Sequence, residues 1–257
     1  MVISTTTKAK LSDTTRTTIG LVVLSQDESA EDDFRTLFDE TTRIHVSRIM
    51  SPDEISVESC LTMAPLITAT ASLFPRSVQL TSVGYGCTSA TSVIGAERVS
   101  QLLKAGCDAA NTTNPLTAAV AACSHLGVSK CGMVTPYVLE VNKTMIDQFE
   151  VLGSITTECL VSFVESNDYQ VARIDPESMY EAAVKLAEDN VGKIDFLFLS
   201  CTNLRTLSVI SQIENETGIP CLSSNLCWAW HMAQQSGAKL NSQVQSKLIQ
   251  SSSAMRK

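Results

Sequence analysis

Short apolar runs alternate with longer amphipathic stretches along most of this 257-residue chain. Alternating strands and helices at this spacing predict βαβ units and a mostly parallel sheet, because parallel neighbours need a crossover connection. A helix is expected over Thr206–Glu216, shortly after the fourth apolar run. The runs that we expect to form buried strands are Ile19–Leu24, Val78–Tyr85, Lys130–Thr135, Ile194–Leu199 and Ile219–Leu222.

Parts of this alternation repeat at a separation of 114 positions. A matched separation in three places favours internal duplication over a generic α/β rhythm. We therefore expect an α/β fold of two pseudo-symmetric lobes, each a short, mostly parallel sheet flanked by helices, with an active site in the cleft between them. The matched pairs are Cys87 and Cys201, Cys107 and Cys221, and Asn111 and Asn225.

The repeat also divides the chain into segments. Residues 1–16 are polar and lack periodicity, so we expect them to form a flexible tail. Residues 17–110 together with 225–257 are assigned to the first lobe, and residues 111–224 to the second.

Charge and composition exclude several classes of function. The formal net charge of −8 argues against a nucleic-acid or anionic-membrane partner, and no apolar run is long enough to span a bilayer. The N-terminus lacks an apolar signal-peptide core, which favours a cytoplasmic protein. Nine cysteines are spread over the whole chain, so a disulfide framework is not expected.

Two of these cysteines, Cys87 and Cys201, each stand before a threonine where a strand-like run ends. In an open parallel sheet, ligands bind beyond the carboxyl ends of the strands. A thiol at a strand-to-helix turn gains from free amides and the helix N-terminus, which lower its pKa. The neighbouring hydroxyl residues Thr88, Ser89 and Thr202 suit a turn that binds a carboxylate. Two thiols on opposite faces of one ligand fit proton transfer or addition across that ligand.

Other interpretations of the same residues stay open. Cysteine is among the most buried residue types, so either thiol could be a small core residue. Gly84 and Gly86 supply the start of a dinucleotide-binding motif, but position 89 is Ser and no acidic ribose partner follows. Trp228 and Trp230 lie on opposite faces of a helix, and we expect one to be packed and the other exposed.

The segments GYGCTSATSVIG, VTPYVLEVN, NDYQVARI and FLSCTNLR resemble the aspartate/glutamate racemase superfamily, in the branch of maleate isomerases and arylmalonate decarboxylases. Within it, the chain looks most similar to racemase-like proteins of ectoine-utilisation gene sets. The similarity covers about residues 18–240. It implies two pseudo-symmetric α/β lobes with the site between them, an isomerase without metal or organic cofactor, and self-association into a homo-oligomer in some members.

The resemblance also implies roles for individual residues. Cys87 matches the nucleophile or base of the isomerases, and Cys201 matches the opposing thiol that acts as acid. Tyr137, like Thr88 and Ser89, matches a residue that binds a substrate carboxylate. Asn167 matches an Asn that contacts the second carboxylate of maleate, and the decarboxylases have Gly in place of the first cysteine.

One position departs from the family pattern. Maleate isomerases have a carboxylate-binding Asn where this chain has Asp27. An Asp there would repel a dicarboxylate and favour an ammonium group, which points to an amino acid or an ectoine-derived diamino acid. The alternative is that Asp27 only caps the following helix.

The sequence therefore predicts a two-cysteine racemase or isomerase of a small carboxylate. It leaves three alternatives: a maleate cis-trans isomerase, an arylmalonate-type decarboxylase, and a small-acid binding protein without catalysis. The substrate itself is not specified by any of these residues.

Overall fold

The computed structural model describes residues 6–10 and 16–254. Residues 6–10 are exposed and contain neither helix nor strand, and most of the rest of the expected tail, residues 1–5 and 11–15, lies outside the described residues. Two four-stranded parallel sheets form the centre of the molecule, as expected. Within the described ranges, no helix has the length and apolarity that crossing a membrane requires.

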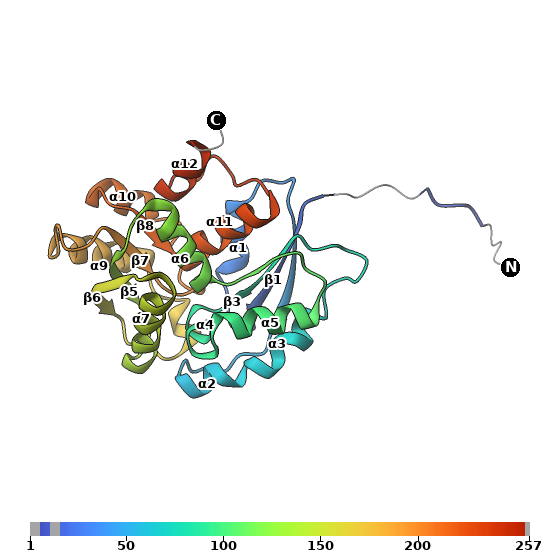
Figure 1. Ribbon diagram of the computed structural model, residues 1–257, viewed down its shortest axis with the longest axis horizontal. Helices are drawn as coiled ribbons and strands as arrows, with labels where there is room; N and C mark the ends of the chain where they lie inside the picture. Colours follow the sequence, from blue (N-terminus) through green and yellow to red (C-terminus); the bar gives the residue numbers. More distant parts are fainter. Residues whose placement is uncertain (1–5, 11–15, 255–257) are drawn as a thin grey trace.

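The first sheet has the strand order β2-β1-β3-β4. It lies at one side of the molecule, with α3 and α5 on one of its faces (Figure 1). Its strands are β1 (Thr18–Leu24), β2 (Arg43–Ile49), β3 (Ser82–Gly86) and β4 (Thr112–Thr113). Its helices are α1 (Ala30–Leu37), α2 (Val57–Thr62), α3 (Ala64–Ala71), α4 (Thr88–Ile94) and α5 (Ala96–Gly106).

The second sheet has the order β6-β5-β7-β8, which is the order of the first sheet in a second copy. The predicted duplication is therefore visible in the topology. Its strands are β5 (Lys130–Thr135), β6 (Thr156–Ser162), β7 (Phe196–Leu199) and β8 (Cys221–Ser223). Its helices are α7 (Leu139–Gly153), α8 (Asp168–Val171), α9 (Pro176–Glu188) and α10 (Ile210–Thr217).

Three further helices, α6 (Pro115–Leu126), α11 (Ser224–Ser236) and α12 (Lys247–Ala254), complete the fold. Helices α6 and α11 lie between the two sheets (Figure 1). One core cluster runs from β1 through these helices to β5 and β7, so the two sheets share buried apolar surface. Strand β4 extends the first sheet two residues beyond residue 111, where the second lobe is expected to begin. The division into lobes stays a prediction.

The five expected strands are all present, but β2, β4 and β6 were not expected. All three lie at sheet edges. Most residues of β2 and β6 are only partly buried, so their sequences mix polar and apolar side chains instead of forming an apolar run.

The glycines of GYG serve packing. A Cβ atom at Gly84 would lie 2.0 Å from Trp228 Nε1, and one at Gly86 would lie 2.6 Å from the same indole. The indole of Trp228 also contacts Phe34 edge-on, with ring centroids 4.7 Å apart. The expectation that one tryptophan is exposed is wrong: Trp230 is buried as well, and its Nε1 donates to Ser252.

Candidate functional site

Cys87 stands at the junction of β3 and α4. Its backbone is extended, it serves as the N-cap of α4, and the Ala90 amide donates to its Sγ at 3.3 Å. The Ser89 hydroxyl lies 3.4 Å from the same sulfur. The side chain is buried, at 5% exposure. This is the strand-to-helix position that the sequence predicts for a reactive thiol.

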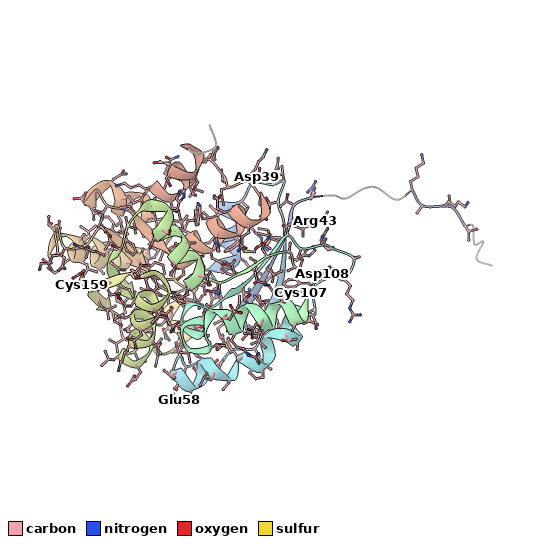
Figure 2. The ribbon with its side chains drawn as sticks, in the orientation of Figure 1. Asp39, Arg43, Glu58, Cys107, Asp108 and Cys159 are labelled. Carbon is pink, nitrogen blue, oxygen red and sulfur yellow. The ribbon has the colours of Figure 1, made fainter. Side chains whose placement is uncertain are left out.

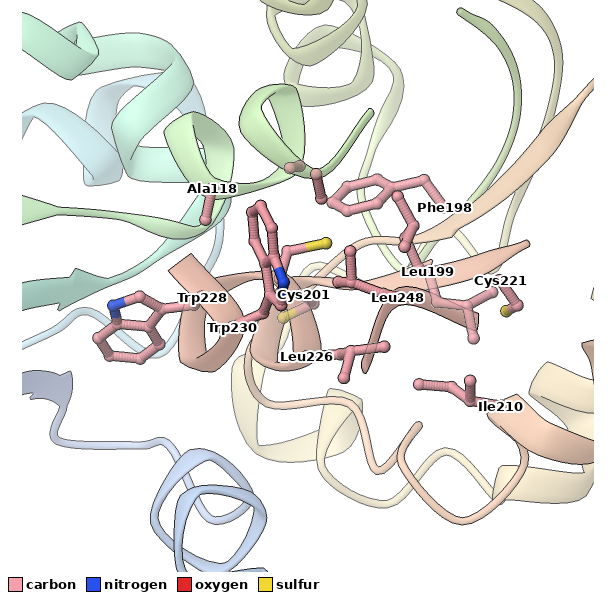
Figure 3. Packing of buried hydrophobic residues seen from close by; sticks show 14 of the residues in the cluster. Ala118, Phe198, Leu199, Cys201, Ile210, Cys221, Leu226, Trp228, Trp230 and Leu248 are labelled. Carbon is pink, nitrogen blue, oxygen red and sulfur yellow. The ribbon is translucent and has the colours of Figure 1, made fainter. Parts of the chain in front are cut away.

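Cys201 follows β7 in a different local structure. Helix α10 begins at Ile210 and not at Thr206, so residues 202–209, which contain turns and no helix, separate this thiol from the next helix in the chain. The backbone φ of Cys201 is 153°, a value that favours glycine and that non-glycine residues adopt at some energetic cost. Its amide donates to Ser224 Oγ at 3.1 Å. Figure 3 shows Cys201 among the buried residues of the core cluster that also includes Trp228 and Leu226 of α11.

Hydrogen bonds fasten the two Cys-Thr turns to each other. The Thr202 hydroxyl donates to the Gly86 carbonyl at 3.2 Å. Ser224 Oγ accepts from the Cys201 amide and lies 2.8 Å from the Thr88 hydroxyl, so it bridges both turns. Both turns therefore belong to one rigid polar unit at the centre of the molecule. Ser224 precedes the matched Asn225 of the repeat and was not among the predicted site residues.

Both thiols line one small cavity between the sheets. Its free volume is about 20 Å³, which is close to the space of one water molecule, so a carboxylate substrate requires its walls to move. Of the predicted site residues, the cavity brings together Cys87, Thr88, Ser89, Tyr137, Cys201 and Thr202. The remaining lining residues are Leu24, Ser51, Pro52, Glu54, Ile55, Ser59, Cys60, Met63 and Asp168.

A segment of the first lobe closes this cavity. The Ile55 amide donates to the Ser166 carbonyl at 2.7 Å, and the Asp168 amide donates to the Asp53 carbonyl at 2.8 Å. These bonds form an antiparallel bridge between Glu54 and Asn167. The segment before α2 therefore covers the cavity and is tied to the segment before α8.

Tyr137 is held just beyond the end of β5. Its carbonyl accepts from the Asn142 side-chain amide at 2.9 Å and from the Ser162 hydroxyl. The side chain is 1% exposed, and its hydroxyl has no hydrogen bond of good geometry among the described residues, although it lies beside the Cys201 thiol and the Ser200 hydroxyl. A buried hydroxyl in a cavity wall that lacks such a bond is poised to donate to a bound anion.

Two predicted substrate-binding residues do not line the cavity. Asp27 Oδ1 accepts from the amides of Ser29 and Ala30 at 2.9 and 2.8 Å, which is the helix-capping alternative. Asn167 Oδ1 accepts from the Gln170 amide at 3.1 Å and caps α8 in the same way. The polar side chain that enters the cavity wall from this region is the next residue, Asp168.

Asp168 and Cys60 are lining residues that sequence reasoning missed. Asp168 Oδ1 accepts from Asn203 Nδ2 at 3.1 Å, and the same nitrogen donates to the Gln26 carbonyl. Cys60 Sγ donates to Ser89 Oγ at 3.9 Å, so a third thiol adjoins the cavity. Cys60 lies on α2, and the position 114 residues further along the chain is Ile174, so the repeat gives no signal for this thiol.

The expected lowering of the thiol pKa values is wrong. Burial raises the pKa of Cys87 well above its ordinary value, although the Ser89 hydroxyl and the Ala90 amide oppose this. Burial also raises the pKa of Cys201, and the nearby carboxylates of Asp168 and Asp27 raise it further. The loss of hydration raises the thiol pKa by more than the helix N-terminus lowers it, because the cavity is nearly closed.

Burial is also the main influence on the pKa of Cys60. Burial raises it to about 11, with a smaller opposing effect from the Ser89 hydroxyl. All three cavity thiols are therefore protonated in the closed structure at neutral pH.

The fold and the site together define the class of this protein. It is an α/β protein of two lobes, with a thiol at the end of a strand in each lobe and both thiols in the wall of one buried cavity. Residues 88–249 match the family described as arylmalonate decarboxylase. The match covers more than half of the chain, so the chain belongs to the arylmalonate decarboxylase family.

Two curated proteins are similar over part of their length. A maleate isomerase of Alcaligenes faecalis is 25% identical over 113 residues, which is 44% of each chain. An arylmalonate decarboxylase of Bordetella bronchiseptica is 27% identical over 128 residues, which is 49% of this chain and 51% of that protein. The chain thus spans about half the length of the curated relatives it matches.

Solved structures show the same fold. A Nocardia farcinica maleate cis-trans isomerase bound to TRIS has a TM-score of 0.78 at 21% identity, covering 93% of this chain and 100% of that one. A cysteine-to-serine mutant of that isomerase, with a covalently bound succinylcysteine intermediate, has a TM-score of 0.77 at 21% identity, covering 90% and 97%. An arylmalonate decarboxylase structure has a TM-score of 0.72 at 21% identity, covering 91% and 99%.

Proposed function

We propose that this protein is an isomerase or racemase of a small carboxylate, and that Cys87 and Cys201 supply the base and the acid. The observation that carries the proposal is the arrangement of both thiols in the wall of one closed cavity. Catalysis by proton transfer needs a group on each side of the substrate at hydrogen-bond reach. The family and the covalent cysteine adduct of a related fold support this chemistry.

The surroundings of the two thiols support different roles. Cys87 receives the Ala90 amide and stands at the N-terminus of α4, both of which favour a thiolate. Cys201 lies near the carboxylates of Asp168 and Asp27, which favour the neutral thiol. We therefore assign Cys87 as the base or nucleophile and Cys201 as the acid.

Racemisation then proceeds in two proton transfers. Cys87 first loses its thiol proton to water, before the substrate closes the cavity. The resulting Cys87 thiolate takes the proton from the α-carbon, which leaves a carbanion stabilised by the adjacent carboxylate. The Cys201 thiol gives its proton to the opposite face, so the configuration inverts and Cys201 becomes the thiolate. In a cis-trans isomerisation, Cys87 Sγ instead adds to one alkene carbon, the Cys201 thiol protonates the other, and rotation precedes the reverse steps.

The substrate carboxylate is proposed to bind near Tyr137, Thr88 and Ser89, whose hydroxyls reach the cavity wall. Thr202 is proposed to maintain the turn that places Cys201, through its bond to Gly86. An amino acid or an ectoine-derived diamino acid stays among the proposed substrates, but Asp27 does not select it, because its Oδ1 caps α1 and the side chain does not line the cavity.

Solvent deuterium exchange, followed by NMR, tests the proposal. The panel holds amino acids, N-acetyl diamino acids, maleate and aryl malonates. We expect exchange at Cα, or conversion of maleate to fumarate, in the wild type. Cys87→Ser and Cys201→Ser should each lower the rate at least a hundredfold. Cys107→Ser serves as the control, because this thiol lies outside the cavity.

Decarboxylation is the second candidate, because the matching family is described as arylmalonate decarboxylase. It predicts carbon dioxide release from an aryl malonate and survival of that activity in Cys87→Gly. If a panel member binds but shows no exchange, isomerisation or carbon dioxide release, both enzyme proposals are wrong and the protein is a small-acid binding protein.

A further inference from the structure

The cavity wall contains one buried carboxylate, on the side of Cys201. Asp168 lines the cavity and is 2% exposed, and it acts on the Cys201 thiol electrostatically. Its Oδ1 accepts from Asn203 Nδ2 at 3.1 Å, and its amide donates to Asp53. The carboxylate is thus held in place by both its side chain and its backbone.

Among the residues that the structure describes, no cation in the cavity wall compensates this charge. The described lining residues include no Lys, Arg or His, and their only charged members are Asp168 and Glu54. Two guanidinium groups of neighbouring segments form ion pairs with other carboxylates: Arg48 with Glu31 at 2.5 Å and Arg173 with Glu28 at 2.8 Å. A buried carboxylate without a cationic partner is costly, and it favours a ligand that supplies one.

A second buried group indicates what else the ligand carries. Tyr137 lines the same cavity, and its buried hydroxyl makes no hydrogen bond of good geometry within the described part of the chain, although the Cys201 thiol and the Ser200 hydroxyl lie beside it. The hydroxyl residues Thr88 and Ser89 lie in the same wall. These groups donate hydrogen bonds to an anion, whereas Asp168 accepts them from a cation. The cavity therefore offers complementary partners for one carboxylate and one positive group.

We propose that Asp168 selects substrates that carry an ammonium group in addition to their carboxylate, and that it rejects dicarboxylates. The inference rests on the proposed function, because it takes this cavity as the substrate site. A dicarboxylate would bring its second negative charge beside the buried Asp168, where charge repulsion is stronger than in bulk water. An ammonium group at the same place would form a charge-assisted hydrogen bond.

The ionisation of Asp168 is compatible with this role. Burial raises the pKa of this carboxyl to about 6, against the opposing effect of the Asn203 amide. At pH 7.5 it is therefore mostly ionised even before a cation binds. A bound ammonium group would keep it so.

Calorimetric titration of the wild-type protein at pH 7.5 tests the proposal with paired probes of equal chain length. The pairs are glycine and malonate, 3-aminopropanoate and succinate, and 4-aminobutanoate and glutarate. In at least one pair we expect the amino acid to bind at least tenfold more tightly than the dicarboxylate. Asp168→Asn, which keeps an oxygen for Asn203, should reduce that preference to less than twofold.

Glu54→Gln is the matched control, because it removes the same charge from an exposed lining residue. It should change the preference by less than twofold. Should Asp168→Asn fail to fold, Asp168→Glu keeps the charge and should keep the sign of the preference. Equal or tighter binding of every dicarboxylate by the wild type overturns the inference. A preference that survives Asp168→Asn, or that depends on Glu54, overturns it as well.

These outcomes separate the inference from the proposed function. Binding preference needs no turnover, whereas the function depends on exchange that both thiols support. If the binding preference depends on Asp168 but no panel member shows exchange, the inference is retained and the isomerase proposal is overturned. If the wild type prefers a dicarboxylate and converts it in a reaction that needs both thiols, the isomerase proposal is retained and the inference is overturned.

Discussion

The hydroxyl of Thr202 donates a hydrogen bond to the carbonyl of Gly86 at 3.2 Å, which joins the turn of one candidate catalytic thiol to the turn of the other. The two residues are far apart in the sequence and come from different sheets. Ser224 completes this connection from α11. The distance between the thiols therefore depends on a few buried hydroxyls, and these can be changed one at a time.

Ser224→Ala should separate positioning from stability. The variant loses the bonds to Thr88 and to the Cys201 amide, and we expect it to lower the free energy of unfolding by about 1–3 kcal/mol and the exchange rate about tenfold. Ser223→Ala is the control, because Ser223 only caps α11 and should cost about 1 kcal/mol. Urea unfolding and deuterium exchange measure the two effects. Equal exchange rates in both variants would contradict the positioning role.

Gly84→Ala should be strongly destabilising. Its new methyl group would overlap the indole of Trp228, and overpacking of a core at such contacts costs about 1–3 kcal/mol or more. Gly127→Ala is the comparison: it has open space but a φ of 70°, so only the strain of about 1 kcal/mol is expected. Urea unfolding of both proteins tests this order, and an unchanged midpoint for Gly84→Ala would refute the packing argument.

The pH dependence of stability should include a contribution from Asp33. Burial raises the pKa of this carboxyl to about 7, and the carboxylates of Asp27 and Asp32 add to the effect of burial. Between about pH 4 and pH 7, the Asp33 carboxyl is therefore protonated in the folded state and ionised in the unfolded state. This contribution to stability is complete below pH 4 and is lost as the pH rises through 7.

Asp33→Asn should make the free energy of unfolding less dependent on pH between pH 5 and 8. A shift of this size corresponds to at most about 4 kcal/mol, and a smaller change is expected because the side chain is only partly buried. Urea titrations at pH 5, 6.5 and 8 measure it. Asp32→Asn, an exposed carboxylate on the same helix, is the control. An identical slope in Asp33→Asn and wild type would count against the raised pKa.

The thiols should react with iodoacetamide in the order of their exposure. Cys107 and Cys159 are only partly buried and lie towards the edges of the molecule (Figure 2). Cys87 and Cys201 are nearly inaccessible, and burial raises their pKa values, so their alkylation should be at least tenfold slower at pH 7 and should accelerate with pH. Peptide mass spectrometry reads the order. Faster labelling of Cys87 than of Cys107 at pH 7 would show that the cavity is open in solution.

Much of the fold is predictable from local pattern. The central strands β1, β3, β5 and β7 are apolar runs because they are buried on both faces, and such runs are visible in the residues themselves. Edge strands such as β2 are not predicted by a search for apolar runs, because their half-exposed positions accept polar residues. The helix after Cys201 begins later than its amphipathic pattern indicates, since Thr202 and Asn203 hydrogen-bond to Gly86 and Gln26 in the other half of the molecule.

Some residues of the candidate site can likewise be predicted from local pattern, and others cannot. Two thiols that follow two matched strands are visible in the residues alone, because strand ends and the turn residues after them are local features. The packing of distant segments brings Asp168, Cys60 and Ser224 to these thiols, and it places Asp27 Oδ1 on the amides at the start of α1. It also decided that both thiols are protonated at rest. Partners, burial and the pKa depend on which distant segments close around a group, and no local pattern contains that information.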